Sequence, residues 1–288
     1  MTKGEQTIVL SGTEPVLTDP TALSTDVSLA TVNLDLRNLV FVSPLDLVTL
    51  AAWSISVPEK ARGEVLPPDP SLSSYLERMR LLACFREAGW NVPKTKTGPW
   101  EDLPERLLEV TSLAGPNDVE DLADRLPRLW QGRTGDPKRS RALHFAFGEL
   151  SDNATTHSGE SPIFVAAQRY TGVTSPHPAR LELAVADGGI GVPAHLRSNP
   201  EYADVEDDGQ AILLALRPGV TGTRDQRGYG FHDVLGEVGE IGTGELVVVA
   251  GMSMVVAPFG QPSKRKSARR LPDSVKGTLV QVRIYEDE

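Results

Sequence analysis

The feature that most constrains the fold is the order of elements between residues 136 and 191, where one amphipathic helix leads into two strands and a glycine-rich turn. Asp136 and Pro137 open the helix, since Asp supplies an N-cap oxygen and Pro suits the first helical position. The apolar residues that follow recur at helical spacing: Leu143, Phe147, Leu150 and Ala154. The pattern predicts a helix with one buried face.

Two polar residues border this apolar stripe. Glu149 and Asn153 are four positions apart, so they lie beside each other on one side of the helix. At the edge of the core, a ligand could reach both. Taken alone, such a pair is more often ordinary helix surface.

Strands are predicted at 162–167 and 181–186, and the 171–178 loop favours an antiparallel hairpin. Asp187 ends the second strand, directly before the turn Gly188-Gly189-Ile190-Gly191. A carboxylate there can accept a hydrogen bond from an exocyclic amine such as that of adenine, and glycines let the backbone approach a ligand closely. The competing interpretation is a surface turn. A dinucleotide-binding fingerprint is not present, because the third glycine and the helix opening on the turn are missing.

A second glycine cluster, Gly228 and Gly230, precedes a short helical stretch at 232–235. Backbone N–H groups at the start of a helix attract phosphate, and Arg224 and Arg227 add positive charge nearby. This cluster is therefore a second candidate for contact with a phosphate group.

A last glycine turn, Gly277-Thr278, enters an alternating strand that ends at Ile284. The chain thus carries a helical Glu-x-x-x-Asn, then Asp-x-Gly-x-Gly after a strand, Gly-x-Gly before a helix, and Gly-Thr before a final strand. In this order and spacing, residues 136–286 resemble the GHKL (histidine-kinase-like) ATPase family, and within it the anti-sigma-factor serine kinases most. The resemblance implies an α/β two-layer sandwich of the Bergerat type, with a mixed sheet covered on one face by helices.

The resemblance also implies a role for each matching residue. Asn153 would bind Mg²⁺ through its amide oxygen, and Glu149 would orient or deprotonate the attacking water or the acceptor group. Asp187 would bind the adenine amino group of ATP. The other matching residues would surround the nucleotide: Gly189 and Gly191 at base and sugar, Arg227, Gly228 and Gly230 at the phosphates, and Thr278 near the adenine.

Residues 192–227 would form the ATP lid, a long mobile loop with a short helix at 210–216. Such lids close over the nucleotide. Arg217, Arg224 and Arg227 are candidates for contact with the terminal phosphate, and solvated surface charge explains any one of them equally well.

The first part of the chain predicts a smaller α/β unit. Strands at 29–41 and 64–66 alternate with a helix at 44–52 and one longer helix at 71–89. Residues 1–28, rich in Thr, Ser and Pro, are expected to be a flexible lead.

Residues 34–44 are similar to the central strand and following turn of STAS domains. Where a phosphorylatable STAS domain has its serine, this chain has Pro44, and Asp46 falls where glycine is expected. Regulation by phosphorylation of this turn is therefore not expected.

We divide the chain into the lead, a STAS-like α/β domain with linker at 29–130, and a GHKL ATP-binding domain at 136–288. A predicted strand at 106–113 and a predicted helix at 118–130 either close the first domain or bridge to the second. The sequence does not decide between these arrangements.

The composition reduces the number of functions that the chain is expected to have. The net charge of −10 argues against general nucleic-acid binding. The single cysteine, the lack of a signal-like start and the lack of an apolar run of roughly 18 residues favour a cytoplasmic protein without membrane contact. One basic run, 264–270, is expected to be a solvated hairpin loop, with partner docking as the alternative.

Two functions remain open. The protein is either an enzyme that hydrolyses ATP or transfers its phosphoryl group to a protein partner, or a non-catalytic module in which ATP and the lid control partner binding. A homodimer fits either function.

Overall fold

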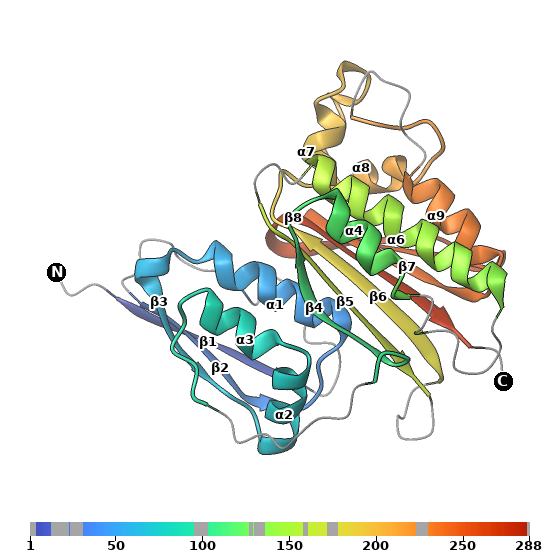
Figure 1. Cartoon of the computed structure of the whole chain (residues 1–288). Helices are drawn as coiled ribbons and strands as arrows, with labels where there is room; N and C mark the ends of the chain where they lie inside the picture. The colour runs from blue at the N-terminus through green and yellow to red at the C-terminus, as the bar shows by residue number, and fades with distance from the viewer. Residues whose placement is uncertain are drawn as a thin grey trace.

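The computed structural model describes residues 4–12, 23, 31–94, 103–126, 129, 136–157, 161–171, 178–222 and 230–286. The chain forms a three-stranded sheet followed by a five-stranded sheet, with helices packed against both (Figure 1). The predicted α/β class is thereby confirmed. Among the described helices, none has the length and apolar character needed to span a bilayer.

The first sheet is parallel. In spatial order it contains β1 (Glu5–Gly12), β2 (Thr31–Leu39) and β3 (Arg62–Leu66). The expectation of a flexible lead is wrong for β1, because Ile8 and Leu10 are buried and Ile8 pairs in register with Leu34 of β2. A strand that pairs with a distant segment leaves little trace in its own sequence.

Helix α1 (Pro44–Ser56) lies between the two sheets (Figure 1). It begins with a capping box, in which Ser43 Oγ accepts from Asp46 N at 3.3 Å and the Asp46 carboxylate accepts from Ser43 N at 2.7 Å. Ten of its 13 residues are buried, because α1 shares one hydrophobic core with Leu34 of β2 and with Phe164 of the second sheet. A helix buried on most sides is a core helix.

Two helices follow β3 where the sequence predicts one over 71–89. They are α2 (Pro70–Arg78) and α3 (Leu81–Glu87). Arg80, between them, has a φ of 63° and so leaves the right-handed helix. The break directs the carbonyl of Met79 to the N–H of Val110, 3.0 Å away on the second sheet. The prediction of one helix is wrong because this tertiary contact overrides the local helical pattern.

The second sheet is antiparallel throughout. In spatial order it contains β4 (Leu107–Leu113), β5 (Ile163–Tyr170), β6 (Arg180–Asp187), β8 (Ser267–Tyr285) and β7 (Thr243–Phe259). The predicted β5–β6 hairpin is confirmed, and the predicted mixed sheet is wrong. Because β4 pairs with β5, this strand belongs to the second sheet, which the sequence left open.

Helices cover both faces of the second sheet (Figure 1). Leu183 and Val185 of β6 share a core with the helices of one face, whereas Ala184 and Ala186 share a core with α1 on the other. The covering helices of the first face are α4 (Pro116–Ala123), α6 (Pro137–His157) and α9 (Gly230–Gly239). The remaining short helices are η3 (Glu59–Ala61), α7 (Val192–Arg197), η4 (Pro200–Tyr202) and α8 (Asp208–Ala215). The expectation that helices cover only one face is therefore wrong.

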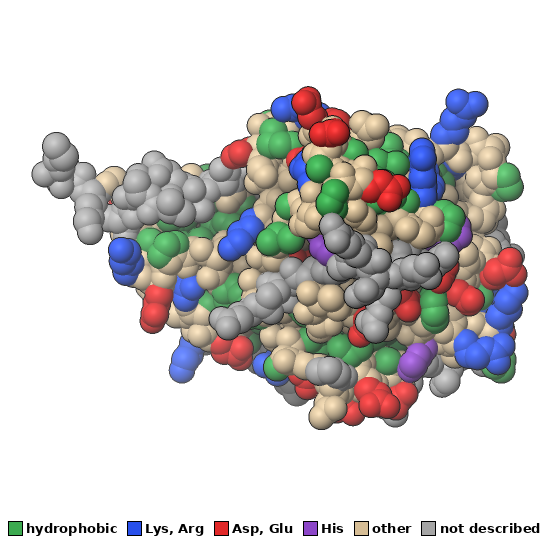
Figure 2. Space-filling view, turned by 90° about the horizontal axis from the view of Figure 1, so that it is seen from above, with side chains coloured by type: hydrophobic (Ala, Val, Ile, Leu, Met, Phe, Trp, Pro, Cys, Tyr) green, Lys and Arg blue, Asp and Glu red, His purple; other side chains and the backbone are tan. Residues whose placement is uncertain are grey.

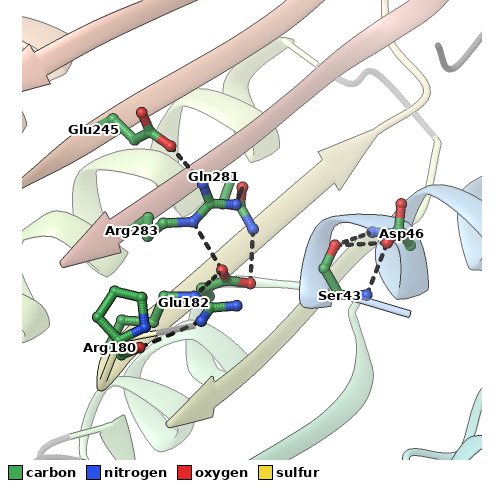
Figure 3. Close-up of polar contacts among 8 residues, drawn as sticks. Ser43, Asp46, Arg180, Glu182, Glu245, Gln281 and Arg283 are labelled. Carbon is green, nitrogen blue, oxygen red and sulfur yellow. Dashed lines mark hydrogen bonds and ion pairs between the residues drawn. The ribbon is translucent and has the colours of Figure 1, made fainter. Parts of the chain in front are cut away.

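A buried ion cluster lies on the face of the sheet that meets the N-terminal unit (Figure 3). Glu182 of β6 accepts from Arg180 Nε at 2.7 Å and from Arg283 Nε at 2.8 Å through Oε1, and from Gln281 Nε2 at 3.2 Å through Oε2. The guanidinium of Arg180 also lies 4.1 Å from the centre of the Tyr170 ring. The fully buried carboxylate is thus paired and hydrogen-bonded, as a charge in a protein interior requires.

We expect Glu182→Gln to lower the free energy of unfolding by about 3 to 5 kcal/mol, because Arg180 and Arg283 lose their shared counter-charge. Urea denaturation measures this change. The matched control is Glu87→Gln, since Glu87 and its partner Arg80 are 66% and 58% exposed, and its expected effect is below about 1 kcal/mol. Equal losses in the two variants would contradict a buried, stability-determining cluster.

Candidate functional site

A pocket opens between α6, α7 and α9, at the end of β6 and beside the middle of β8, enclosing about 760 Å³ including its open mouth. Five residues that the sequence singled out line the pocket: Asn153, Asp187, Gly191, Gly230 and Thr278. They come from α6, the end of β6, the starts of α7 and α9, and β8, so the fold brings together segments far apart in the chain.

Asp187 is a buried acceptor in the pocket wall, only 6% exposed. It faces Thr278 across the β6–β8 pair, and it accepts from the backbone N–H of Gly189 at 2.8 Å. Burial raises the pKa of Asp187 to about 6, while hydrogen bonds from Gly189 and from the backbone and side chain of Thr278 oppose this rise. The carboxylate is therefore fixed in position, and its oxygens have further acceptor capacity.

The glycines around Asp187 allow close backbone contacts. Gly191 and Gly277 have φ values of 79° and 77°, a conformation that favours glycine. A Cβ on Gly191 would lie 2.8 Å from the Gly277 carbonyl oxygen, and a Cβ on Gly277 would overlap the Asp187 carbonyl. Gly189 is not among the described lining residues, and its observed role is the bond to Asp187.

Glu149 and Asn153 lie side by side against the first residue of α9. A Cβ on Gly230 would be 2.7 Å from Asn153 Nδ2 and 3.2 Å from Glu149 Oε2. Burial and the nearby carboxylates of Asp152 and Asp233 raise the pKa of Glu149. Asn153 lines the pocket, whereas Glu149 is not among the described lining residues. The pair therefore faces a helix start, where unsatisfied N–H groups favour an anion.

The segment over 192–222 contains α7, η4 and α8, and the short helix expected within the lid is α8. Asp208 attaches this segment to β7, because its Oδ2 accepts a hydrogen bond from Met252 N at 2.6 Å. Its Oδ1 accepts from Arg197 of α7 at 2.7 Å and so joins α7 to α8. Gly251, with a φ of 56°, leaves no space for a Cβ beside the Asp208 carboxylate. The expected long loop is wrong for this part of the lid, because these contacts organise it into helices on the sheet.

The other predicted phosphate contacts are not tested by the structure. Arg224, Arg227 and Gly228 lie outside the described residues. Arg217 is exposed after α8, and burial together with the positive charge of Arg217 lowers the pKa of Lys266. Seen from the α7–α8 side, the surface carries acidic and basic side chains interspersed (Figure 2).

Several residues of the pocket wall lie in segments without a recognisable sequence motif. His195 lines the pocket from α7, and burial lowers the pKa of its imidazole, which favours the neutral form of the ring. A Cβ on Gly222 would lie 2.6 Å from His195 Nε2, so the ring lies against Gly222. Other lining residues that no sequence pattern indicates as part of a site are Leu196, Ala215, Val220, Thr221 and Phe231. A single histidine in a stretch that looks like a loop has no diagnostic spacing.

No protein-family model matches the chain, and no curated protein matches its sequence significantly.

Asp187→Asn tests the buried charge. The pKa of Asp187 is about 6 in the folded protein and 3.8 when the group is exposed, so the folded protein holds the proton more tightly. Protonation of Asp187 therefore stabilises the folded protein. This stabilisation is complete below pH 3.8 and is lost as the pH rises through 6. The Asp187→Asn variant lacks this pH-dependent stabilisation, because its amide does not titrate.

Relative to the wild type, the free energy of unfolding of Asp187→Asn should therefore increase by about 3 kcal/mol between acidic and mildly alkaline pH. Urea denaturation of both proteins across this range measures the difference. A difference that does not change with pH would contradict a buried carboxylate at this position.

Proposed function

We propose that the pocket binds ATP with Mg²⁺, that residues 136–286 form a GHKL-type ATP-binding domain, and that bound ATP regulates a protein partner. The observation that carries the proposal is the shared pocket of Asp187, Thr278, Asn153 and Gly230. The GHKL resemblance assigns the same residues to the base, the metal and the phosphates. Because a fold alone does not fix function, the proposal depends on this set of side chains.

The adenine would bind at the Asp187 end of the pocket. Asp187 offers a fixed acceptor to the exocyclic amine, with the Thr278 side chain beside it. The surrounding walls are apolar, as a flat base requires: Val185, Leu196, Phe231 and Val280. A single charged acceptor in an apolar pocket would both strengthen the binding of the adenine and fix its orientation.

The phosphates would lie toward Gly230, at the start of α9. Free N–H groups at the start of a ten-residue helix attract phosphate. Asn153 supplies a nearby amide oxygen, and Glu149 lies beside it. Mg²⁺ keeps several waters and takes one or two protein ligands together with substrate phosphates, so the Asn153 oxygen suffices as the protein ligand. When bound, Mg²⁺ would neutralise phosphate charge, and Asn153 would hold it.

In the enzymatic form of the proposal, Glu149 is the general base. Its raised pKa strengthens it as a proton acceptor. It would take the proton from water, or from a hydroxyl of a partner protein, as that oxygen bonds to the γ-phosphorus and the bond to ADP breaks. The second form is a non-catalytic module in which ATP controls partner binding through the lid. Glu149 does not line the pocket, which favours this second form.

The N-terminal unit would be the STAS-like domain. Ser43 is 1% exposed and its hydroxyl is bonded to Asp46, so the turn before α1 offers no accessible hydroxyl for phosphorylation at this residue. We assign this unit a supporting role on the second sheet.

The test is incubation of the purified protein with Mg²⁺ and γ-labelled ATP, with and without a cell lysate. An ATPase releases labelled phosphate, a kinase labels a protein, and a binding module does neither while equilibrium dialysis shows bound ATP. We expect Glu149→Ala to reduce any turnover by about 100-fold or more and to leave bound ATP unchanged, because the base acts on the reaction and not on binding. Absence of bound ATP in the wild-type protein would contradict both forms of the proposal.

A further inference from the structure

A basic ribbon extends past the end of the second sheet. Asp187, the last residue of β6, pairs with Thr278, so residues 267–276 of β8 run beyond β6. Within this extension, Ser267–Arg270 pairs with β7, which corrects the expectation that the basic run 264–270 is entirely loop. We call residues 264–276 the basic ribbon.

The basic ribbon concentrates positive charge. It contains six cations and one acid, Asp273. The cations are all exposed: Lys264, Arg265, Lys266, Arg269, Arg270 and Lys276. Within the described ranges, none of them forms a salt bridge. Arg217 adds a further cation beside Lys266.

This concentration contrasts with the rest of the protein. The ribbon has a net charge of +5 (six minus one), and the whole chain −10, so the remainder carries −15. Several arginines elsewhere are neutralised by acids of the same chain, as Arg197 is by Asp208 and Arg169 by Glu286. Exposed cations that form no salt bridge with the described residues attract an anionic ligand, even on an acidic protein.

The chemistry of the ribbon selects among anionic ligands. Residues 260–276 contain no aromatic side chain, so bases of a nucleic acid have nothing to stack on. The ribbon offers no large apolar side chain to a lipid surface, since Leu271 is buried and Val275 partly buried. One edge of Ser267–Arg270 pairs with β7, and no described strand pairs with its other edge. Such an edge offers backbone groups to an extended peptide.

We propose that the basic ribbon docks an acidic, extended segment of a protein partner, whose carboxylates pair with Arg265, Arg269 and Arg270. This docking does not require nucleotide in the pocket. The ribbon also touches the lid, because a Cβ on Gly209 of α8 would lie 3.0 Å from the Ala268 Cβ. The ribbon itself therefore contacts the helix that ends at Ala215, a residue of the pocket wall.

The test uses the full-length protein without nucleotide and a fluorescein-labelled peptide that alternates Glu and Thr. A peptide with Gln in place of Glu, a thymidine oligonucleotide and phosphatidylserine-containing vesicles are compared with it. Fluorescence anisotropy should show binding of the acidic peptide, weakened by salt, and much weaker binding of the Gln peptide.

The decisive variant combines Arg265→Glu, Arg269→Glu and Arg270→Glu, and should bind the acidic peptide at least about tenfold more weakly because three exposed ion pairs are lost and reversed. The matched control combines Lys60→Glu, Lys94→Glu and Arg141→Glu, three exposed cations outside the ribbon with the same change in net charge. Its affinity should change less than about threefold, because distant charges are screened.

Three results would overturn the proposal: no binding of the acidic peptide, equal losses in the two triple variants, or ribbon-dependent binding of the oligonucleotide or vesicles in preference to the peptide. Circular dichroism and thermal unfolding of both variants verify that each is folded. Since nucleotide is absent from these measurements, their outcome is separate from that of the ATP proposal.

Discussion

The pairing of β6 with β8 is the interaction on which the rest of the structure depends. Its register sets Asp187 opposite Thr278 at one end and Glu182 opposite Arg283 nearer the other. Because side chains alternate along a strand, Asp187 faces the pocket and Glu182 faces the N-terminal unit. A slip of one residue would exchange these two faces, so the buried ion cluster and the pocket acid require the same register.

The N-terminal unit packs against this sheet on the face away from the pocket. Helix α1 fills the space between the sheets, and its core is continuous with that of the second sheet. Tyr75 of α2 donates to Gln168 of β5, and Val110 N donates to the Met79 carbonyl, so polar contacts as well as apolar ones join the two units.

The sequence revealed those parts of the fold and site that are encoded locally. The apolar stripe and N-cap of α6, the β5–β6 hairpin and the acid at the end of β6 all follow from short-range patterns. The parts it missed depend on long-range contacts. Strand β1 forms only by pairing with β2, and the left-handed Arg80 coincides with a contact to β4. Helix α8 is fastened to Met252, 44 positions away, through Asp208, and no local pattern encodes this contact.

The measurement that tests the account most directly is a calorimetric titration of the protein with ATP and with GTP in the presence of Mg²⁺. If the buried carboxylate of Asp187 accepts the adenine amine, Asp187→Asn should weaken ATP binding by roughly 10- to 150-fold, the loss expected for a charged hydrogen-bond acceptor, and should reduce the preference for ATP over GTP. Asp204→Asn, at an exposed acid of the lid segment, serves as the control and should leave both affinities unchanged. Unchanged ATP affinity in Asp187→Asn would contradict the assignment of this pocket to adenine.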